Sequence, residues 1–202
     1  MPNEHAPAVR KRAAPRAPDR RVARTQRALG AALVELMLAH DFDDISVQQV
    51  LDRARVGRAT FYAHFRSKHD LLLSDAERFW AALEAHFLAH AGGTTRVAPV
   101  AELFAHVADV ERFQRALERA GLHATVHELL GAHAARLIER RLGELRPDVG
   151  RAALPRAAVS RLLAAALLEM LRWWLDRAER PDPREMDAQF HAIVWGGVAR
   201  LG

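Results

Sequence analysis

The spacing of apolar residues along the 202-residue chain predicts a protein built from helices. In a first helix, which we predict at Arg20–His40, the residues Leu29, Leu33, Leu36 and Met37 recur mostly at intervals of three and four, as a single buried face requires. Ala and Leu dominate the apolar residues and β-branched residues are sparse, so we expect an all-α fold. The other predicted helices span residues 47–54, 58–65, 68–90, 98–108, 110–120, 122–145, 155–179 and 183–200.

The second predicted helix carries a strong start signal. Ser46 is followed three residues later by Gln49, which makes a capping box, and Ile45 and Val50 flank this box as a hydrophobic staple. A short glycine-containing break then leads into the third helix. Two short helices that are joined by a tight turn and packed on a longer helix form a helix-turn-helix, which we place within residues 46–65. The second helix of such a unit lies in the major groove of DNA.

The placement of basic residues points to an anionic partner. A cation at a helix N-terminus is unfavourable, yet Arg58 opens the third predicted helix, and Arg66 and Lys68 flank the start of the fourth. Phosphates bound at both helix ends would explain this arrangement, because free backbone amides also point outward there. Thr60 and Tyr62 add hydroxyl donors nearby. The alternative is a solvated charged face, and the helix-turn-helix pattern favours DNA over it.

Composition narrows the class of protein without settling its function. The formal net charge is +5, and Arg residues are concentrated in the Pro- and Ala-rich residues 1–24, which suit either a polyanion partner or a solvated tail without a role. The absence of Cys excludes disulfides and thiolate zinc sites. No run of about 18 apolar residues is present, so we expect a soluble, cytoplasmic protein that makes no use of a membrane.

A set of short motifs between residues 41 and 72 follows one spaced pattern: Asp41-Phe42, Ser46-Val47, Ala54-Arg55-Val56-Gly57, Ala59-Thr60-Phe61-Tyr62-Ala63-His64-Phe65 and Lys68-His69-Asp70-Leu71-Leu72. Together they resemble the N-terminal domain of the TetR/AcrR family of bacterial transcriptional regulators. The resemblance covers about the first third of the chain. Beyond it, only the helical layout, the chain length and a Trp-rich penultimate helix are similar.

One position departs from the family pattern. The glycine that the family has in the turn between the two short helices is replaced here by Arg55. If this position is left-handed, a residue other than Gly costs roughly 1 kcal/mol. Alternatively, Gly57 re-phases the turn.

The resemblance implies both an architecture and a function. A tail at residues 1–19 would precede a helix-turn-helix DNA-binding domain at 20–67 and a helical effector-binding and dimerisation domain at 68–202. A homodimer would bind a palindromic operator in double-stranded DNA as a repressor, and an unknown small-molecule effector would release it. Arg58 could pair with a guanine. The residues expected at the DNA are Ser46, Gln48, Arg58, Ala59, Thr60, Tyr62, His64 and Lys68.

The last two predicted helices are apolar over more than one narrow stripe, which suits a four-helix bundle between two subunits. The alternative is that both helices belong to the core of a single chain. A palindromic operator needs two recognition helices about 34 Å apart, which favours the dimer. The residues expected at the dimer interface are Leu163, Leu167, Met170, Trp174, Phe190 and Val194.

The middle helices, at about 98–145, would enclose the effector pocket. The residues expected to line it are Leu103, Phe104, His106, Phe113, His123, His127 and Trp173. Aromatic stripes are more often core than pocket, so this expectation competes with simple packing.

Two pairs of His residues lie four apart, at His86 and His90 and at His123 and His127, and this spacing can place two imidazoles on one metal ion. No third ligand stands at a fixed spacing, so we expect neither a metal nor a cofactor. Two other functions remain as alternatives: an architectural DNA-binding protein that needs no effector, and an enzyme such as a His-dependent metal hydrolase. No nucleophile–base constellation is present, so we expect no catalytic residues.

Overall fold

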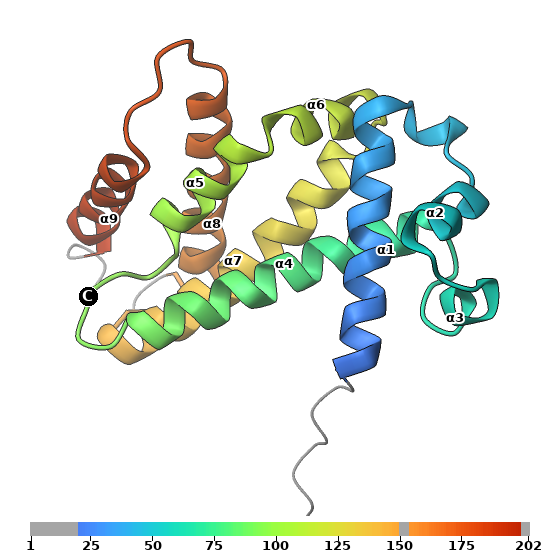
Figure 1. Ribbon diagram of the computed structural model, residues 1–202. Helices are drawn as coiled ribbons and strands as arrows, with labels where there is room; N and C mark the ends of the chain where they lie inside the picture. Colours follow the sequence, from blue (N-terminus) through green and yellow to red (C-terminus); the bar gives the residue numbers. More distant parts are fainter. Residues whose placement is uncertain (1–19, 150–153, 199–202) are drawn as a thin grey trace, which may run out of the picture.

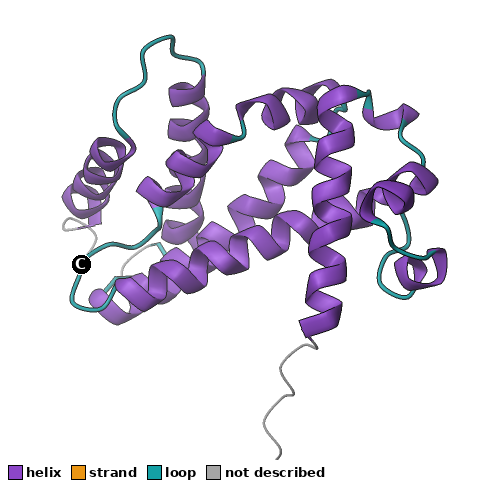
Figure 2. Cartoon of the chain, viewed as in Figure 1, coloured by secondary structure: helices purple, strands orange, loops and turns teal. Residues whose placement is uncertain are grey.

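The computed structural model describes residues 20–149 and 154–198, and within these ranges every regular element is a helix (Figure 2). The expected all-α fold is therefore confirmed. The predicted tail at 1–19 and the end of the last predicted helix lie outside the described residues. The elements are α1 (Arg20–Ala39), the 3₁₀ turn η1 (Phe42–Asp44), α2 (Val47–Ala54), α3 (Arg58–Tyr62), α4 (Lys68–His90), α5 (Val100–Asp109), α6 (Glu111–Arg119), α7 (His123–Leu145), α8 (Arg156–Leu175) and α9 (Pro183–Val198).

Local capping explains where α2 and α4 begin. The Ser46 hydroxyl accepts a hydrogen bond from the backbone N–H of Gln49 at 3.2 Å, and the Gln49 side chain accepts one from the backbone N–H of Ser46 at 2.7 Å. This is the capping box that the sequence predicts. Ser67 caps α4 in the same way, by accepting from the backbone N–H of Asp70 at 3.1 Å. Both bonds satisfy amides that have no partner within the helix.

Two helices end earlier than predicted. After Tyr62 the chain tightens, and the N–H of His64 bonds to the carbonyl of Phe61 only three residues back, so α3 does not continue to Phe65. Helix α8 ends at Leu175, where the Arg180 guanidinium donates to the terminal Leu175 carbonyl at 2.9 Å. A side chain that satisfies a terminal carbonyl in this way stops the helix without a glycine.

The buried apolar residues form two clusters. The N-terminal core joins α1, η1, α2, α3 and the first turn of α4, and it also takes in Ala116 and Leu117 of α6. The C-terminal core joins the rest of α4, including Trp80 and Phe87, to α5, α7, α8 and α9. Helix α4 runs between the two regions and belongs to both (Figure 1). The domain boundary at 67/68 stays a prediction, but the N-terminal core reaches past it.

The crossing of α1 over α4 is close because a glycine stands at it. A Cβ on Gly30 would lie 2.3 Å from the Asp75 carboxylate, which is too near for any side chain. Asp75 is itself held by Arg78 at 2.7 Å. Helix α1 is thereby fixed against α4.

The loop that follows α4, residues 91–99, is the meeting point of several helices. Arg141 of α7 is 8% exposed and donates to the carbonyls of Thr94 and Arg96, both at 3.1 Å. It also pairs with Glu144 at 2.6 Å. Because a guanidinium carries five donors, one side chain can fix several loop carbonyls at once.

Helix α9 is tied to the same loop by polar contacts. Arg96 donates to both Glu102 of α5 and Asp187 of α9, each at 2.6 Å. The buried His191 accepts a hydrogen bond on Nε2 from the backbone N–H of Val97 at 3.0 Å. Burial by itself would raise the pKa of Asp187, but hydrogen bonds from His191 and Arg96 bring it below its ordinary value. The loop thus joins the C-terminal end of α4 to α9.

No helix in the described part of the chain is both long enough and apolar enough to cross a membrane.

Candidate nucleic-acid interface

Helix α3 is held in place by one ring. Phe61 is fully buried and lies 5.7 Å from the ring of Phe65 in the N-terminal core. A five-residue helix has little stability of its own, so this anchor fixes how α3 is presented. Because Phe61 points inward, the neighbouring residues Arg58, Ala59, Thr60 and Tyr62 point to solvent, and all four are exposed.

The cations on this surface have no carboxylate partners. The Arg58 guanidinium lies over the Tyr62 ring, 5.6 Å from its centroid. Arg55 and Arg66 are also exposed, and within the residues described neither side chain makes an ion pair or a hydrogen bond. Most other arginines of α4 to α8 are paired with carboxylates or with backbone carbonyls. This end of the molecule therefore offers positive charge that the fold itself does not use.

Three other residues that the sequence places at DNA are partly committed within the fold. The Ser46 hydroxyl caps α2, and the Gln48 side chain donates to Asp52 at 2.8 Å along the same helix. His64 is half-buried beside Phe65. Ser46 and Gln48 are nevertheless exposed, so their expected DNA contacts stay predictions.

Lys68 has a role that sequence reasoning missed. Its ammonium donates to the carbonyls of Phe42, Asp43 and Ile45, with distances of 3.1 Å and 2.9 Å for the latter two. It also lies over the Phe42 ring, 4.5 Å from the centroid. A lysine has three donors and all three are used here, so the expected phosphate contact is not supported. Lys68 instead fixes η1 to the start of α4.

The turn between α2 and α3 keeps the phase of the family pattern. Arg55 adopts φ 55° and ψ 45°, the left-handed conformation, whereas Gly57 has an ordinary φ of −70°. The turn is therefore not re-phased onto Gly57. A side chain in this region costs roughly 1 kcal/mol relative to glycine.

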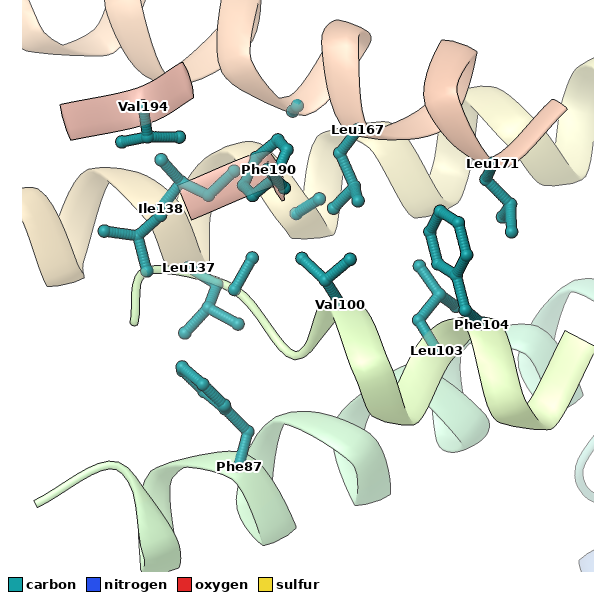
Figure 3. Packing of buried hydrophobic residues seen from close by; sticks show 14 of the residues in the cluster. Phe87, Val100, Leu103, Phe104, Leu137, Ile138, Leu167, Leu171, Phe190 and Val194 are labelled. Atoms are coloured by element: carbon teal, nitrogen blue, oxygen red, sulfur yellow. The ribbon is translucent and has the colours of Figure 1, made fainter. Parts of the chain in front are cut away.

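The structure does not bring the expected effector-pocket residues together. Leu103 and Phe104 are fully buried in the C-terminal core (Figure 3). His106 stacks on Phe79, and Phe113 packs against the N-terminal core. Trp173 lies outside any pocket, with 46% of its surface exposed. The expectation that these five residues line one pocket is wrong. The α5 residues Leu103 and Phe104 fill the core instead.

His123 and His127 do share a groove, with a volume of about 360 Å³. Burial lowers the pKa of His127 below its ordinary value of 6.5, and the neighbouring His123 and Arg172 lower it further, which favours the neutral imidazole. We call this hollow the α6–α8 groove. Its lining residues are Val107, Gln114, Glu118, His123, Val126, His127, Leu130, Leu168, Leu171, Arg172, Leu175 and Asp176.

Most of the expected dimer-interface residues lie inside the single chain. Leu167, Trp174, Phe190 and Val194 are each at most 2% exposed, and Figure 3 shows Leu167, Phe190 and Val194 within the C-terminal core. This expectation is corrected: the stripe chosen from the sequence is the one that packs inward. Leu163 and Met170 are half-buried against the same core.

Helices α8 and α9 each expose a large apolar side chain to solvent. Leu162 of α8 is 62% exposed and Ile193 of α9 is 65% exposed. Ala166 on α8 and Ala192 on α9 are also exposed. These four residues, with Trp173, are called the α8–α9 face below.

The paired histidines make local contacts only. His90 Nδ1 lies 2.8 Å from the carbonyl of His86, and the rings of His123 and His127 lie 5.7 Å apart. Within residues 20–149 and 154–198, no group of three His, Cys, Asp or Glu side chains is arranged to hold a metal ion.

Sequence comparison finds that the N-terminal helices are similar to a known family. Residues 29–74 match the family model for bacterial regulatory proteins of the tetR family. The helix-turn-helix-type transcriptional regulator YxbF of Bacillus subtilis (strain 168) is 33% identical over 69 residues, or 34% of this chain. The chain spans only 18% of the length of that relative.

Solved structures show a similar arrangement of helices over most of the chain. The TetR transcriptional regulator from Streptococcus agalactiae 2603V has a TM-score of 0.58 at 22% identity, over 87% of this chain and 96% of that one. The dihydroxyacetone kinase operon activator DhaS has a TM-score of 0.68 at 18% identity, over 88% and 97%. At these identities the likeness concerns the fold alone. Residues 29–74 thus match the tetR family model, and the described residues share the fold of these solved structures.

Proposed function

We propose that this protein is a transcription regulator that reads double-stranded DNA with α3. The observation that carries the proposal is the exposed row Arg58, Ala59, Thr60 and Tyr62, which the buried Phe61 holds in one orientation. Arg58 would read a guanine in the major groove, and Thr60 and Tyr62 would bind phosphates. A regulator of this kind acts in the bacterial cytoplasm and carries out no catalysis.

The test begins with selection from random duplexes, which yields the half-site, its symmetry and its spacing. Arg58→Ala should then lower affinity for the selected operator by a factor of about 5 to 150, corresponding to 1–3 kcal/mol, and relax specificity at one base pair. Arg112→Ala is the matched control, because this α6 arginine is also exposed and unpaired in the described part of the chain. Equal losses in both variants, or no duplex binding at low salt, would contradict the proposal.

The proposed regulator is a homodimer, paired through the α8–α9 face. The large exposed apolar side chains of Leu162 on α8 and Ile193 on α9 support this, since a second copy would remove them from water. Leu162→Asp combined with Ile193→Asp should give a monomer by light scattering, while Ala85→Asp on the exposed side of α4 should not. A dimeric double variant would rule out this face.

We propose that a small molecule in the α6–α8 groove releases the dimer from its operator, so that the protein acts as a repressor. The groove combines apolar side chains with His127, Glu118 and Arg172, which suits a compound that has both an apolar body and polar groups. Compounds that raise the unfolding midpoint should also weaken DNA binding, and His127→Leu should reduce both effects. DNA binding that no stabilising compound changes would favour the architectural alternative.

A further inference from the structure

The turn between α2 and α3 contains a strained residue. Arg55 has φ 55°, and it is the non-glycine residue with a positive φ among those that the structure describes. An L side chain avoids this conformation because its Cβ crowds the neighbouring carbonyl oxygen. Glycine adopts it without strain, and asparagine adopts it more readily than other residues. A strained position invites the question of what the side chain does there.

The Arg55 side chain does nothing for the fold. The turn is held by its backbone N–H, which bonds to the carbonyls of Leu51 and Asp52 and would do so with any residue. The guanidinium is exposed, and it makes no ion pair, hydrogen bond or ring contact within the described residues. Arg53, two residues earlier, shows the alternative, because its guanidinium pairs with Glu35 of α1 at 2.5 Å. The strain at Arg55 therefore has no compensation inside the molecule.

The position of Arg55 in the molecule suggests a partner outside the chain that would offset this strain. The turn lies at the same end of the molecule as α3 and stands directly before it in the chain (Figure 1). The other cations of this end without a carboxylate partner are Arg58, the first residue of α3, and Arg66, which follows α3 in the sequence. When a helix enters the major groove, the segments at its ends come close to the phosphates that border the groove.

We propose that Arg55 is a DNA-backbone contact particular to this chain, at which stability of the fold is given up for affinity. The proposal rests on the proposed function, since it assumes that α3 enters the major groove. It adds a phosphate contact that the glycine of the family pattern cannot make, because glycine carries no donor beyond its backbone.

Arg55→Gly separates this role from a structural one, since it removes strain and charge together. We expect the urea midpoint of unfolding to rise while operator affinity falls. The plot of log Kobs against log[salt] should lose about 0.9 of its slope, the amount for one phosphate contact. Arg55→Lys keeps both the cation and the strain, and it should keep the slope. Arg112→Ala removes an equal charge from α6 and should leave both affinity and slope unchanged.

Three results would overturn the proposal, and they differ in what they imply for the fold and for the proposed function. If Arg55→Gly is more stable and binds the operator with unchanged affinity and slope, Arg55 is not a contact, although α3 can still read DNA. If Arg55→Gly is less stable than the wild type, the side chain serves the fold. If the wild-type chain ignores duplex DNA at low salt, the proposed function fails together with this contact.

Discussion

Arginine is used in opposite ways at the two ends of the molecule. At the α3 end, Arg55, Arg58 and Arg66 are exposed and have no carboxylate partner in the described residues. At the α9 end, Arg96 and Arg141 are at least half-buried, and each is bonded to carboxylates or to backbone carbonyls of the 91–99 loop.

The difference shows where each charge finds its partner. A buried guanidinium is tolerated only when its donors are satisfied, so Arg96 and Arg141 belong to the stability of the fold. A surface guanidinium without a partner contributes almost nothing to folding and stays available for a ligand. Among these five arginines, the buried and bonded ones hold the fold together, and the exposed ones stay available for a ligand.

The largest effect should follow from Arg141→Met. The carbonyls of Thr94 and Arg96 would lose their donors, so we expect a loss of about 3 kcal/mol in the free energy of unfolding, measured with urea. The adjacent Arg140 is the matched control. It is more exposed and pairs with Glu84 at 2.6 Å, so Arg140→Met should cost less than about 1 kcal/mol. Similar losses in the two variants would remove the distinction between buried and surface arginines.

A smaller effect with a defined pH dependence is expected for Asp187→Asn. Hydrogen bonds from His191 and Arg96 overcome burial and lower the pKa of this carboxyl, so its charged form stabilises the fold. Its contribution is complete above the ordinary value of 3.8 and is lost as the pH falls through the lowered pKa.

At pH 7, Asp187→Asn should therefore cost about 2 kcal/mol in unfolding free energy. The gap between variant and wild type should close as the pH falls below 3.8. Urea titrations at several pH values test this. A gap that does not vary with pH would mean that the carboxylate charge has no part in holding α9 to the loop.

The smallest effect on stability is expected at the α3 end, for a substitution of Arg66. Arg66→Gln removes a cation with no partner in the described part of the chain, so its unfolding free energy should stay within about 0.5 kcal/mol of the wild type. Its salt slope in DNA binding should nevertheless fall, because glutamine releases no counterion. A clear loss of stability would show that this end also uses its arginines internally.

The sequence predicted best the features that are set by neighbours in the chain. The capping box of Ser46 and Gln49 forms within four residues, so the start of α2 follows directly from its sequence. The sequence left open whether Arg55 is left-handed or Gly57 re-phases the turn, and the structure has Arg55 in the left-handed conformation. The exposure of Thr60 and Tyr62 was predictable as well, because Phe61 between them is the apolar residue of the motif.

The predictions of which side chains are buried failed where burial depends on which helix packs against them. Helix α8 is apolar around much of its circumference, so periodicity could not decide between Trp173 and Trp174. Trp174 is buried and donates to the carbonyl of Pro181 at 2.8 Å, whereas Trp173 faces outward. The role of Lys68 also escaped prediction, because its partners on η1 lie more than twenty residues away.

The position of helix α4 in both cores determines whether the two regions can be separated into fragments. Its first turn gives Leu71 to one core, and Trp80 further along the helix belongs to the other, so neither region closes without the same helix. A fragment cut after residue 67 would leave an apolar cavity open to water, and heating the intact chain should melt both regions in a single cooperative step. Because α4 packs in both cores, we expect a displacement of its C-terminal end to be transmitted to the N-terminal helices.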